Sequence, residues 1–254
     1  MDRPSQARDG SPRGVPSRGG RVRAAVRMNW VNLLFLHWRV DATAVRRLVP
    51  RELEIDTFDG SAWVGLVPFR MEASRFTGVP RLPGLRDFFE CNVRTYVRYR
   101  GRSGVWFLSL DAERLLPVLG GRWLWSLNYI HSRFSVRRCE SGTSVDYRVH
   151  RRRGPWPAAK THVVWRPGDI LPSAERGSIQ HFLTERYWLF TRRRGRVLGG
   201  EVLHRPWPLR AAALEHLDDG LVAAAGLRVT GPPLAWASDL LEVEGVALRE
   251  LPVG

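Results

Sequence analysis

Residues 88–112 read FFECNVRTYVRYRGRSGVWFLSLDA, and this stretch decides the predicted fold. It holds two apolar runs rich in β-branched and aromatic residues, 93–100 and 105–111, with Gly101 and Gly104 between them. Two such runs joined by a short glycine-containing turn are typical of an antiparallel hairpin. The stretch therefore predicts two paired β-strands.

The same pattern continues on both sides of this hairpin. Runs bounded by turn residues predict strands at 32–40, 53–57, 62–71, 132–138, 144–152 and 161–165, a hairpin of 187–191 with 197–204, and a last pair around 222–229. Short helices are predicted at 42–49, 178–184 and 210–216, the first two capped by Asp41 and Ser178. Gly120-Gly121 is predicted to interrupt regular secondary structure. We therefore expect a β-dominated α+β fold.

Length and composition favour a single domain. With 254 residues, 44% of them hydrophobic, the chain can bury one large core, and 11 Trp and 10 Phe favour an aromatic core or pocket. Residues 1–27 are rich in Arg, Gly, Pro and Ser, so we expect a disordered tail there; the alternative is that translation starts at Met28. The folded domain is expected to span residues 28–254.

The positive charge of the chain is almost entirely arginine. The formal net charge is +15, and the only lysine is Lys160. Two explanations stay open: a polyanion-binding surface made by the tail and the basic segments 151–153 and 192–196, or the codon bias of a GC-rich genome. We expect the second, and therefore no nucleic-acid partner.

Several kinds of site lack their sequence patterns. The seven histidines are scattered, and Cys91 and Cys139 form no CxxC pair, so we predict no metal and no disulfide framework. No glycine-rich nucleotide loop or nucleophile elbow occurs, and we predict no cofactor. No apolar run approaches the roughly 20 residues of a membrane span, so we expect a cytoplasmic protein without membrane contact. The sequence does not indicate an oligomeric state.

Four stretches of the chain resemble the YqjF-like uncharacterised proteins, a domain-of-unknown-function family of the acetoacetate decarboxylase-like superfamily. They are LHWRVDATAVRRLVPRELEIDTFDGSAWVGLVPFRM (36–71), FFECNVRTYVRYRGRSGVWFLSLDA (88–112), HFLTERYWLF (181–190) and HRPWPLRAA (204–212). The resemblance covers most of residues 29–230. It implies a cone-like, largely antiparallel β-barrel with a few flanking helices and an internal ligand cavity.

The resemblance also bears on chemistry. Acetoacetate decarboxylases use a lysine for Schiff-base formation, and their lysine pair aligns with residues 127–131, LNYIH, where this chain has no lysine. Arginine stays protonated and cannot replace it, and we do not expect Lys160 to do so. The resemblance thus implies a small-molecule-binding barrel that is not a Schiff-base decarboxylase.

Glu90 is the candidate catalytic residue. It follows Phe88 and Phe89, and its position in the motif matches a cavity glutamate of the decarboxylases. Apolar neighbours raise the pKa of a carboxyl group, which suits it to general acid or base catalysis. The alternative is a structural carboxylate paired with Arg94 or Arg98.

Six residues are candidate ligand contacts. Arg94 and Tyr96 share one face of the strand at 93–100, where a guanidinium and a phenol can hold a carboxylate or carbonyl; which face points inward stays open. The other four lie among aromatic residues, with ordinary core positions as the alternative: His37, Asn128, Tyr129 and His131. Segments 184–187 and 204–208 are expected to line the mouth of the barrel. The alternative is that they close the barrel, the first through a salt bridge and the second as a turn.

The leading hypothesis is a barrel that binds a carbonyl or carboxylate compound, either as a lysine-independent enzyme or as a binding protein. A basic polyanion-binding protein is the alternative. A structural or partner-binding role is the third, and it is expected if the aromatic side chains fill the interior of the barrel.

Overall fold

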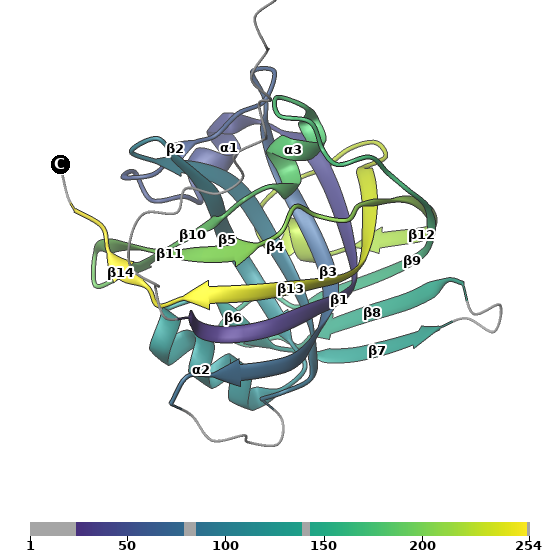
Figure 1. The fold of residues 1–254 in the computed structure, drawn as a ribbon, viewed down its shortest axis with the longest axis horizontal. Coiled ribbons are helices and arrows are strands. Elements are labelled where there is room, and N and C mark those ends of the chain that lie inside the picture. Colours follow the sequence, from purple (N-terminus) through teal and green to yellow (C-terminus); the bar gives the residue numbers. More distant parts are fainter. Residues whose placement is uncertain (1–23, 79–84, 139–142, 253–254) are drawn as a thin grey trace, which may run out of the picture.

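The computed structural model describes residues 24–78, 85–138 and 143–252, and β-strands dominate it (Figure 1). The strands are β1 (Ala24–Val40), β2 (Glu54–Ile55), β3 (Ala62–Phe76), β4 (Phe88–Tyr99), β5 (Arg102–Ala112), β6 (Tyr129–His131), β7 (Arg133–Arg138), β8 (Val145–Arg151), β9 (Ala159–Ile170), β10 (Trp188–Arg193), β11 (Arg196–His204), β12 (Arg210–Asp219), β13 (Leu234–Val246) and β14 (Arg249–Glu250). The helices are α1 (Ala42–Arg46), α2 (Leu115–Trp125), α3 (Ile179–Thr184) and α4 (Leu221–Ala224). The predicted β-dominated fold is confirmed.

Seven of these strands close a barrel. Neighbouring strands follow the order β11-β10-β5-β4-β3-β1-β13, and β13 pairs back onto β11, with Val202 opposite Gly245. Neighbouring strands of the barrel are antiparallel except β10 and β5, which run parallel and place Leu189 opposite Val105. Strands β12, β9, β8 and β7 continue from β13 as a side sheet, seen extending away from the barrel in Figure 1.

The hairpin predicted from residues 88–112 is strands β4 and β5. Tyr99 lies opposite Arg102, and the two residues between them, Arg100 and Gly101, both have positive φ, 50° and 76°. Positive φ at both central residues is the geometry of the tight hairpin turn that matches strand twist. The turn is therefore tighter than the sequence indicated, and Gly104 belongs to β5.

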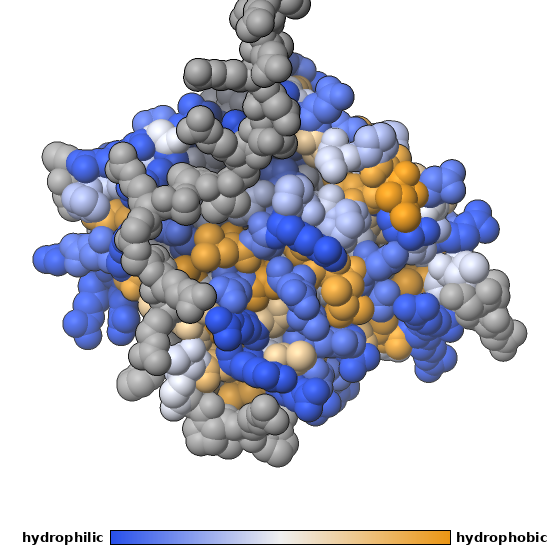
Figure 2. All heavy atoms as spheres, in the orientation of Figure 1, coloured by the Kyte–Doolittle hydropathy of each residue, from blue (hydrophilic) through white to orange (hydrophobic). Residues whose placement is uncertain are grey.

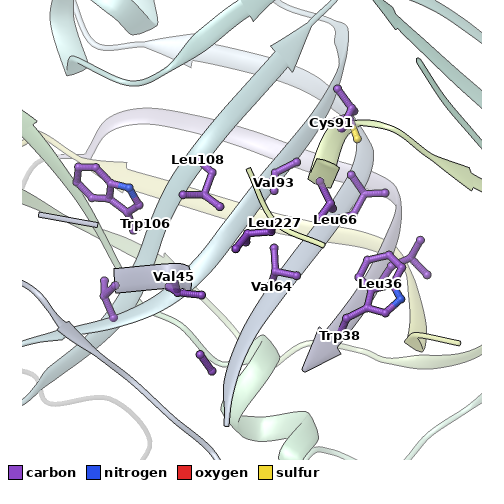
Figure 3. Packing of buried hydrophobic residues seen from close by; sticks show 14 of the residues in the cluster. Leu36, Trp38, Val45, Val64, Leu66, Cys91, Val93, Trp106, Leu108 and Leu227 are labelled. Atoms are coloured by element: carbon purple, nitrogen blue, oxygen red, sulfur yellow. The ribbon is translucent and has the colours of Figure 1, made fainter. Parts of the chain in front are cut away.

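Alternation along the strands divides the core in two. On β1, Leu33 and Phe35 belong to the cluster inside the barrel, whereas Leu34 and Leu36 belong to a second cluster outside it. Figure 3 shows this outer cluster, which packs between the barrel wall, α1, the segment after α4 and the side sheet. Strands β1, β3 and β4 therefore bury side chains on both of their faces.

The predicted start of the folded domain is corrected by four residues. β1 begins at Ala24, and Val26 is buried between Phe76 of β3 and Gly245 of β13. Neighbouring strands on both sides provide backbone partners for residues 24–27, which their composition alone does not indicate. Residues 1–23 of the predicted tail, and Cys139, lie outside the described residues.

Two predictions near the C-terminus are wrong. Residues 210–216 are not a helix but part of β12, where Leu214 lies opposite Trp165 of β9. The alanines favour a helix locally, but pairing with β9 overrides this propensity. Residues 222–229 form no strand pair; α4 begins there instead, because the Asp219 carboxylate accepts the N–H groups of Leu221 and Val222.

The predicted break at Gly120-Gly121 is also wrong, because α2 runs through it. Glycine lowers helix stability by about 1 kcal/mol relative to alanine without preventing a helix, and Pro117 falls in the first turn, where proline is tolerated. Neither β6 nor β13, the strand that closes the barrel, was predicted from the sequence. Helices α1 and α3 begin after their predicted caps, Asp41 and Ser178.

Gly104 allows the parallel contact between β5 and β10. A Cβ atom at this position would lie 2.5 Å from the backbone oxygen of Trp188. We expect Gly104→Ala to lower the free energy of unfolding by about 1–3 kcal/mol, because backbone must move to relieve the overlap. Urea denaturation measures the change. Gly154→Ala is the control, since a Cβ there meets nothing within 4 Å, and equal losses in both variants would contradict the argument.

Candidate functional site

The inside of the barrel contains a cavity of about 230 Å³, several times the roughly 30 Å³ share of one water molecule. Aromatic and aliphatic side chains form most of its wall, so the premise for a purely structural role, a filled interior, does not hold. The polar side chains on the wall are few: Glu90, Asn92, Arg94, Tyr129, Thr184, Arg186 and His204. Three of them come from one strand, β4.

Strand β4 presents residues 90, 92, 94 and 96 to the interior. Val93 and Val97, on the alternate face, belong to the outer cluster. The open question about this strand is therefore answered: the face of Arg94 and Tyr96 points inward, and Glu90 shares it. Period-two alternation carries all four side chains to one side of the sheet.

Glu90 is buried at one end of this row. It is 2% exposed, and its Oε2 accepts a hydrogen bond of 2.8 Å from the hydroxyl of Tyr129 on β6. Burial raises the pKa of Glu90 from 4.5 to about 7, against the opposing effect of hydrogen bonds from Tyr129 and Asn92. No ion pair joins it to an arginine in the part of the chain that the structure describes, so the structural alternative is not observed.

Arg94 lies at the other end of the row. It is 7% exposed, its Nη2 donates to the carbonyl oxygen of Leu183 at 3.1 Å, and its Nε donates to the Tyr96 hydroxyl at 3.4 Å. Among the described residues no carboxylate forms an ion pair with it. A guanidinium buried against apolar walls without a counter-ion is costly unless an anion joins it.

His37 contacts the same Tyr96 hydroxyl to which Arg94 donates. Its Nε2 lies 2.6 Å from the Tyr96 hydroxyl, and burial together with the charge of Arg94 lowers the pKa of His37 well below its usual value. Because Arg94 Nε donates to the Tyr96 hydroxyl, that hydroxyl is free to donate its own hydrogen bond to Nε2 of the neutral imidazole. The ring reaches Tyr96 across Gly65 of β3, where a Cβ would lie 3.0 Å from His37 Cδ2. His37 thus supports the site from behind.

A second arginine lies close to Arg94. Arg186 contacts the cavity and forms a 2.5 Å ion pair with Asp56, which also accepts from Arg98 at 2.8 Å. Arg94 and Arg186 both lie over the ring of Tyr96, at 5.7 and 5.1 Å from its centroid. Asp56 is therefore shared by Arg186 and Arg98 while Arg94 has no carboxylate among the described residues, so this end of the cavity is positive. The salt bridge predicted within segment 184–187 forms with Asp56 instead of Glu185.

The remaining candidate ligand contacts do not all lie in the cavity. Tyr129 lies in the cavity beside Glu90, whereas Asn128 contacts a different, more polar hollow and donates to the carbonyl of Phe107 at 3.2 Å. His131 is exposed, with Nε2 donating to the carbonyl of Glu113 at 3.1 Å, which corrects its expected place near the cavity. Lys160 is exposed near the start of β9 and is not part of the cavity wall.

Sequence reasoning missed Asn92 and Trp30, whereas Trp207 lies in segment 204–208, which was expected to line the barrel mouth. Asn92, Trp30 and Trp207 each have a buried polar atom without a hydrogen-bond partner: Asn92 Oδ1, Trp30 Nε1 and Trp207 Nε1. The two indole rings are stacked, with centroids 5.7 Å apart. The period-two spacing of Glu90 and Arg94 could have identified Asn92, but only the fold brings Trp30 and Trp207 together.

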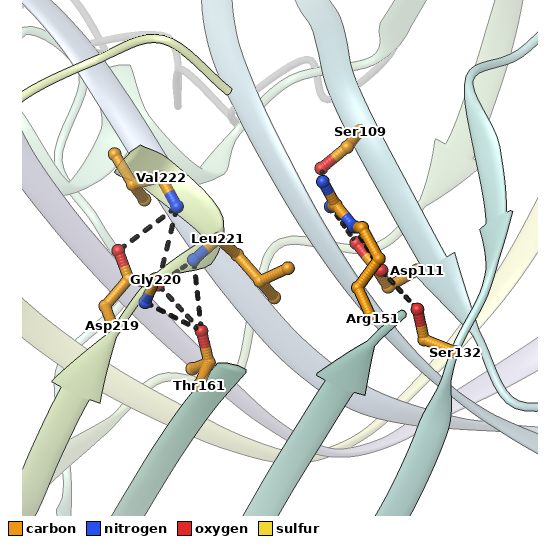
Figure 4. Close-up of polar contacts among 9 residues, drawn as sticks. All are labelled: Ser109, Asp111, Ser132, Arg151, Thr161, Asp219, Gly220, Leu221 and Val222. Carbon is orange, nitrogen blue, oxygen red and sulfur yellow. Dashed lines mark hydrogen bonds and ion pairs between the residues drawn. The ribbon is translucent and has the colours of Figure 1, made fainter. Parts of the chain in front are cut away.

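One basic segment proposed for polyanion binding is partly internal. Arg151 is 1% exposed and holds the fully buried Asp111, while its Nη2 donates to Ser109 at 2.9 Å (Figure 4). The same figure shows the separate network of Thr161 and Asp219 at the start of α4. In segment 192–196, two arginines pair with acidic residues, and on the face in Figure 2 hydrophilic residues are interspersed with hydrophobic ones.

Other kinds of site have little support in the described residues. No group of three or more His, Cys, Asp or Glu side chains is arranged there to hold a metal ion. The described part of the chain also contains no helix long and apolar enough to cross a membrane.

The fold defines the class of protein, an acetoacetate decarboxylase-like barrel. The structure is similar to the enduracididine biosynthesis enzyme MppR complexed with pyruvate (TM-score 0.63, 15% identity, 91% of this chain and 92% of that one). It is also similar to acetoacetate decarboxylase from Legionella pneumophila (TM-score 0.60, 12% identity, 93% and 92%). At these identities the likeness concerns the fold alone.

The sequence comparison is more specific. The DUF2071 family, described as an uncharacterized conserved protein family, matches residues 27–242. The uncharacterized protein YqjF of Bacillus subtilis is 40% identical over 202 residues, covering 80% of this chain and 82% of YqjF. The chain therefore belongs to the DUF2071 family, as its resemblance to YqjF-like proteins implied.

Proposed function

We propose that the barrel binds a small carboxylic acid in its cavity, with the carboxylate held by Arg94 and with Glu90 acting as general acid or base on the opposite part of the ligand. The observation that carries the proposal is the uncompensated charge of Arg94 inside an apolar cavity. Arginine matches a carboxylate with two parallel hydrogen bonds, and these strengthen where water is excluded.

Trp207 supports the same position for the carboxylate. Its ring packs edge-on against Phe35, with centroids 4.8 Å apart. The guanidinium of Arg94 lies over the same Phe35 ring, 5.3 Å from its centroid. Trp207 therefore lies one ring away from Arg94, and its unpartnered indole N–H offers one more donor on the cavity wall.

Glu90 supplies the acid–base part of the proposal. A carboxyl group with a pKa of about 7 is present in both protonation states near neutral pH, which is the condition for efficient proton transfer in either direction. The chemistry does not use a Schiff base, because Lys160, the one lysine of the chain, lies outside the cavity wall. Whether turnover follows binding depends on the ligand's reacting group.

We expect Arg94→Met to weaken carboxylate binding by about 10- to 100-fold, the usual cost of losing a charge-assisted hydrogen-bond pair. The full chain is screened by thermal shift against oxo acids, hydroxy acids and aromatic carboxylic acids, and hits are measured by calorimetric titration. A ligand at a hundred times its Kd stabilises the protein by about 2.7 kcal/mol.

Arg70→Met is the matched control for this screen. Arg70 lies on β3 with its guanidinium over the ring of Phe89 and beside Glu72, so its loss should leave carboxylate binding unchanged. No hit among the acids, or hits that Arg94→Met leaves intact, would refute the proposal. Salt-sensitive binding of nucleic acid in their place would favour the polyanion alternative.

A further inference from the structure

Asn92 occupies the inner face of β4 between the two functional ends of the cavity. The residue is 5% exposed, and its amide nitrogen donates to the Glu90 carboxylate, whose pKa that bond lowers. Its Oδ1 atom is buried and has no hydrogen-bond partner, and Asn92 itself lines the cavity. The cavity therefore offers one acceptor that the protein itself does not satisfy.

A buried acceptor without a partner favours ligands that bring a donor to it. An analogue that lacks the donor leaves the acceptor desolvated and unpaired, so such a site discriminates strongly between the two compounds. An apolar ligand would fill the cavity equally well without the donor, since the rest of the wall around Asn92 is mainly apolar. Asn92 thus contributes specificity that the apolar wall cannot supply.

The position of Arg94 sets the place of the donor on the ligand. Residues 92 and 94 are separated by one strand repeat, roughly 6.6 Å, and the guanidinium extends further away, over Tyr96 and toward Leu183 of α3. A carboxylate at Arg94 and a donor at Asn92 therefore belong to opposite ends of the ligand. Aromatic and aliphatic residues, among them Phe69 and Leu110, form most of the remaining wall and suit an apolar body of the ligand.

The charge of the donor follows from its neighbour. Glu90 is only partly ionised near neutral pH, so it does not provide a full counter-charge for an ammonium group in this apolar interior. A neutral hydroxyl needs no counter-charge. It also places its proton beside the group proposed as general base.

Building on the carboxylate function above, we propose that the ligands of this barrel are hydroxylated carboxylic acids with an apolar body, in which a hydroxyl group remote from the carboxylate donates to Asn92 Oδ1. Asn92 is then the residue that selects hydroxylated compounds, and Arg94 the residue that selects acids. The hydroxyl lies next to Glu90, which makes it the group exposed to acid–base chemistry.

Two probes that differ by one hydroxyl test this inference, 3-(4-hydroxyphenyl)propanoate and 3-phenylpropanoate. We expect the wild-type chain to bind the hydroxylated acid about tenfold more tightly or better by calorimetric titration, because its analogue leaves Asn92 Oδ1 unpaired. In Asn92→Leu the preference should fall to about onefold. Asn128→Leu is the control and should keep the wild-type preference, since Asn128 contacts a different hollow.

The outcomes separate the two proposals. Equal wild-type affinities for the two acids, or a preference that survives in Asn92→Leu, would overturn the role of Asn92 while leaving carboxylate binding in place. Binding of neither acid would remove the carboxylate function and this inference with it. A melting transition recorded for each variant confirms that an altered affinity belongs to a folded protein.

Discussion

Replacement of Arg151 by methionine is expected to lower the free energy of unfolding by about 3–5 kcal/mol, the largest loss of any single substitution considered for this chain. Asp111 is completely buried, and it is held by Arg151 through Nε at 2.9 Å and through Nη2. Without the guanidinium its charge stays in the interior, where the one remaining side-chain partner among the described residues is the Ser132 hydroxyl, 2.5 Å away. Urea denaturation at neutral pH measures the change.

Two further variants identify the cause of that loss. Arg148→Met removes an exposed arginine from the same strand, where it pairs with Asp146, and should leave the unfolding midpoint unchanged. Adding Asp111→Asn to Arg151→Met removes the unpaired charge and should recover part of the stability. If the double variant is less stable than Arg151→Met, an unpaired buried charge is not the cause.

The second large effect is a pH dependence contributed by Glu90. Because its folded-state pKa of about 7 lies above the ordinary 4.5, the folded protein binds this proton more tightly than the unfolded chain does. The contribution of Glu90 is therefore most favourable below about pH 4.5 and is lost as the pH rises through 7. A difference of this size corresponds to about 3 kcal/mol. Glu90→Gln lacks the titrating group, so its stability relative to wild type should increase by up to that amount from pH 4.5 to 8.

Urea denaturation at several pH values measures the difference between Glu90→Gln and wild type. Glu242→Gln, an exposed substitution on β13, is the control and should follow the wild-type curve throughout. A difference between Glu90→Gln and wild type that does not change with pH would show that Glu90 titrates like an ordinary exposed carboxyl group, and it would then be a poor candidate for proton transfer at neutral pH.

Local pattern predicted most clearly the strands that are joined to a neighbouring strand by a short turn. The β4–β5 hairpin is an example, because alternation and a turn with Gly101 define it within 25 residues of sequence. The failure at 210–216 lies where long-range pairing decides. β12 is a strand because β9, about 50 residues earlier, provides its hydrogen-bond partners.

The candidate site shows the same division. Arg94 and Tyr96 were found because they share one strand face at period two, and Glu90 was found from its apolar neighbours and its position in the motif. Asn92 follows from the same pattern and was overlooked. His131 was assigned from its aromatic neighbours in sequence, but it is exposed at the end of β6, and of the two candidates on β6 only Tyr129 lines the cavity.

The sequence by itself determined that the chain folds as a β-rich barrel, that it belongs with YqjF-like proteins, and that no lysine occupies the segment where decarboxylases carry theirs. These are properties of residue type, spacing and similarity. Only the tertiary structure decided that Arg94 lacks a carboxylate while Arg186 has Asp56, that Arg151 is internal, and that Asn92 Oδ1 is unpaired. Pairing of charges and hydrogen bonds depends on side chains from strands distant in sequence, which closure of the barrel brings within a few ångströms of one another.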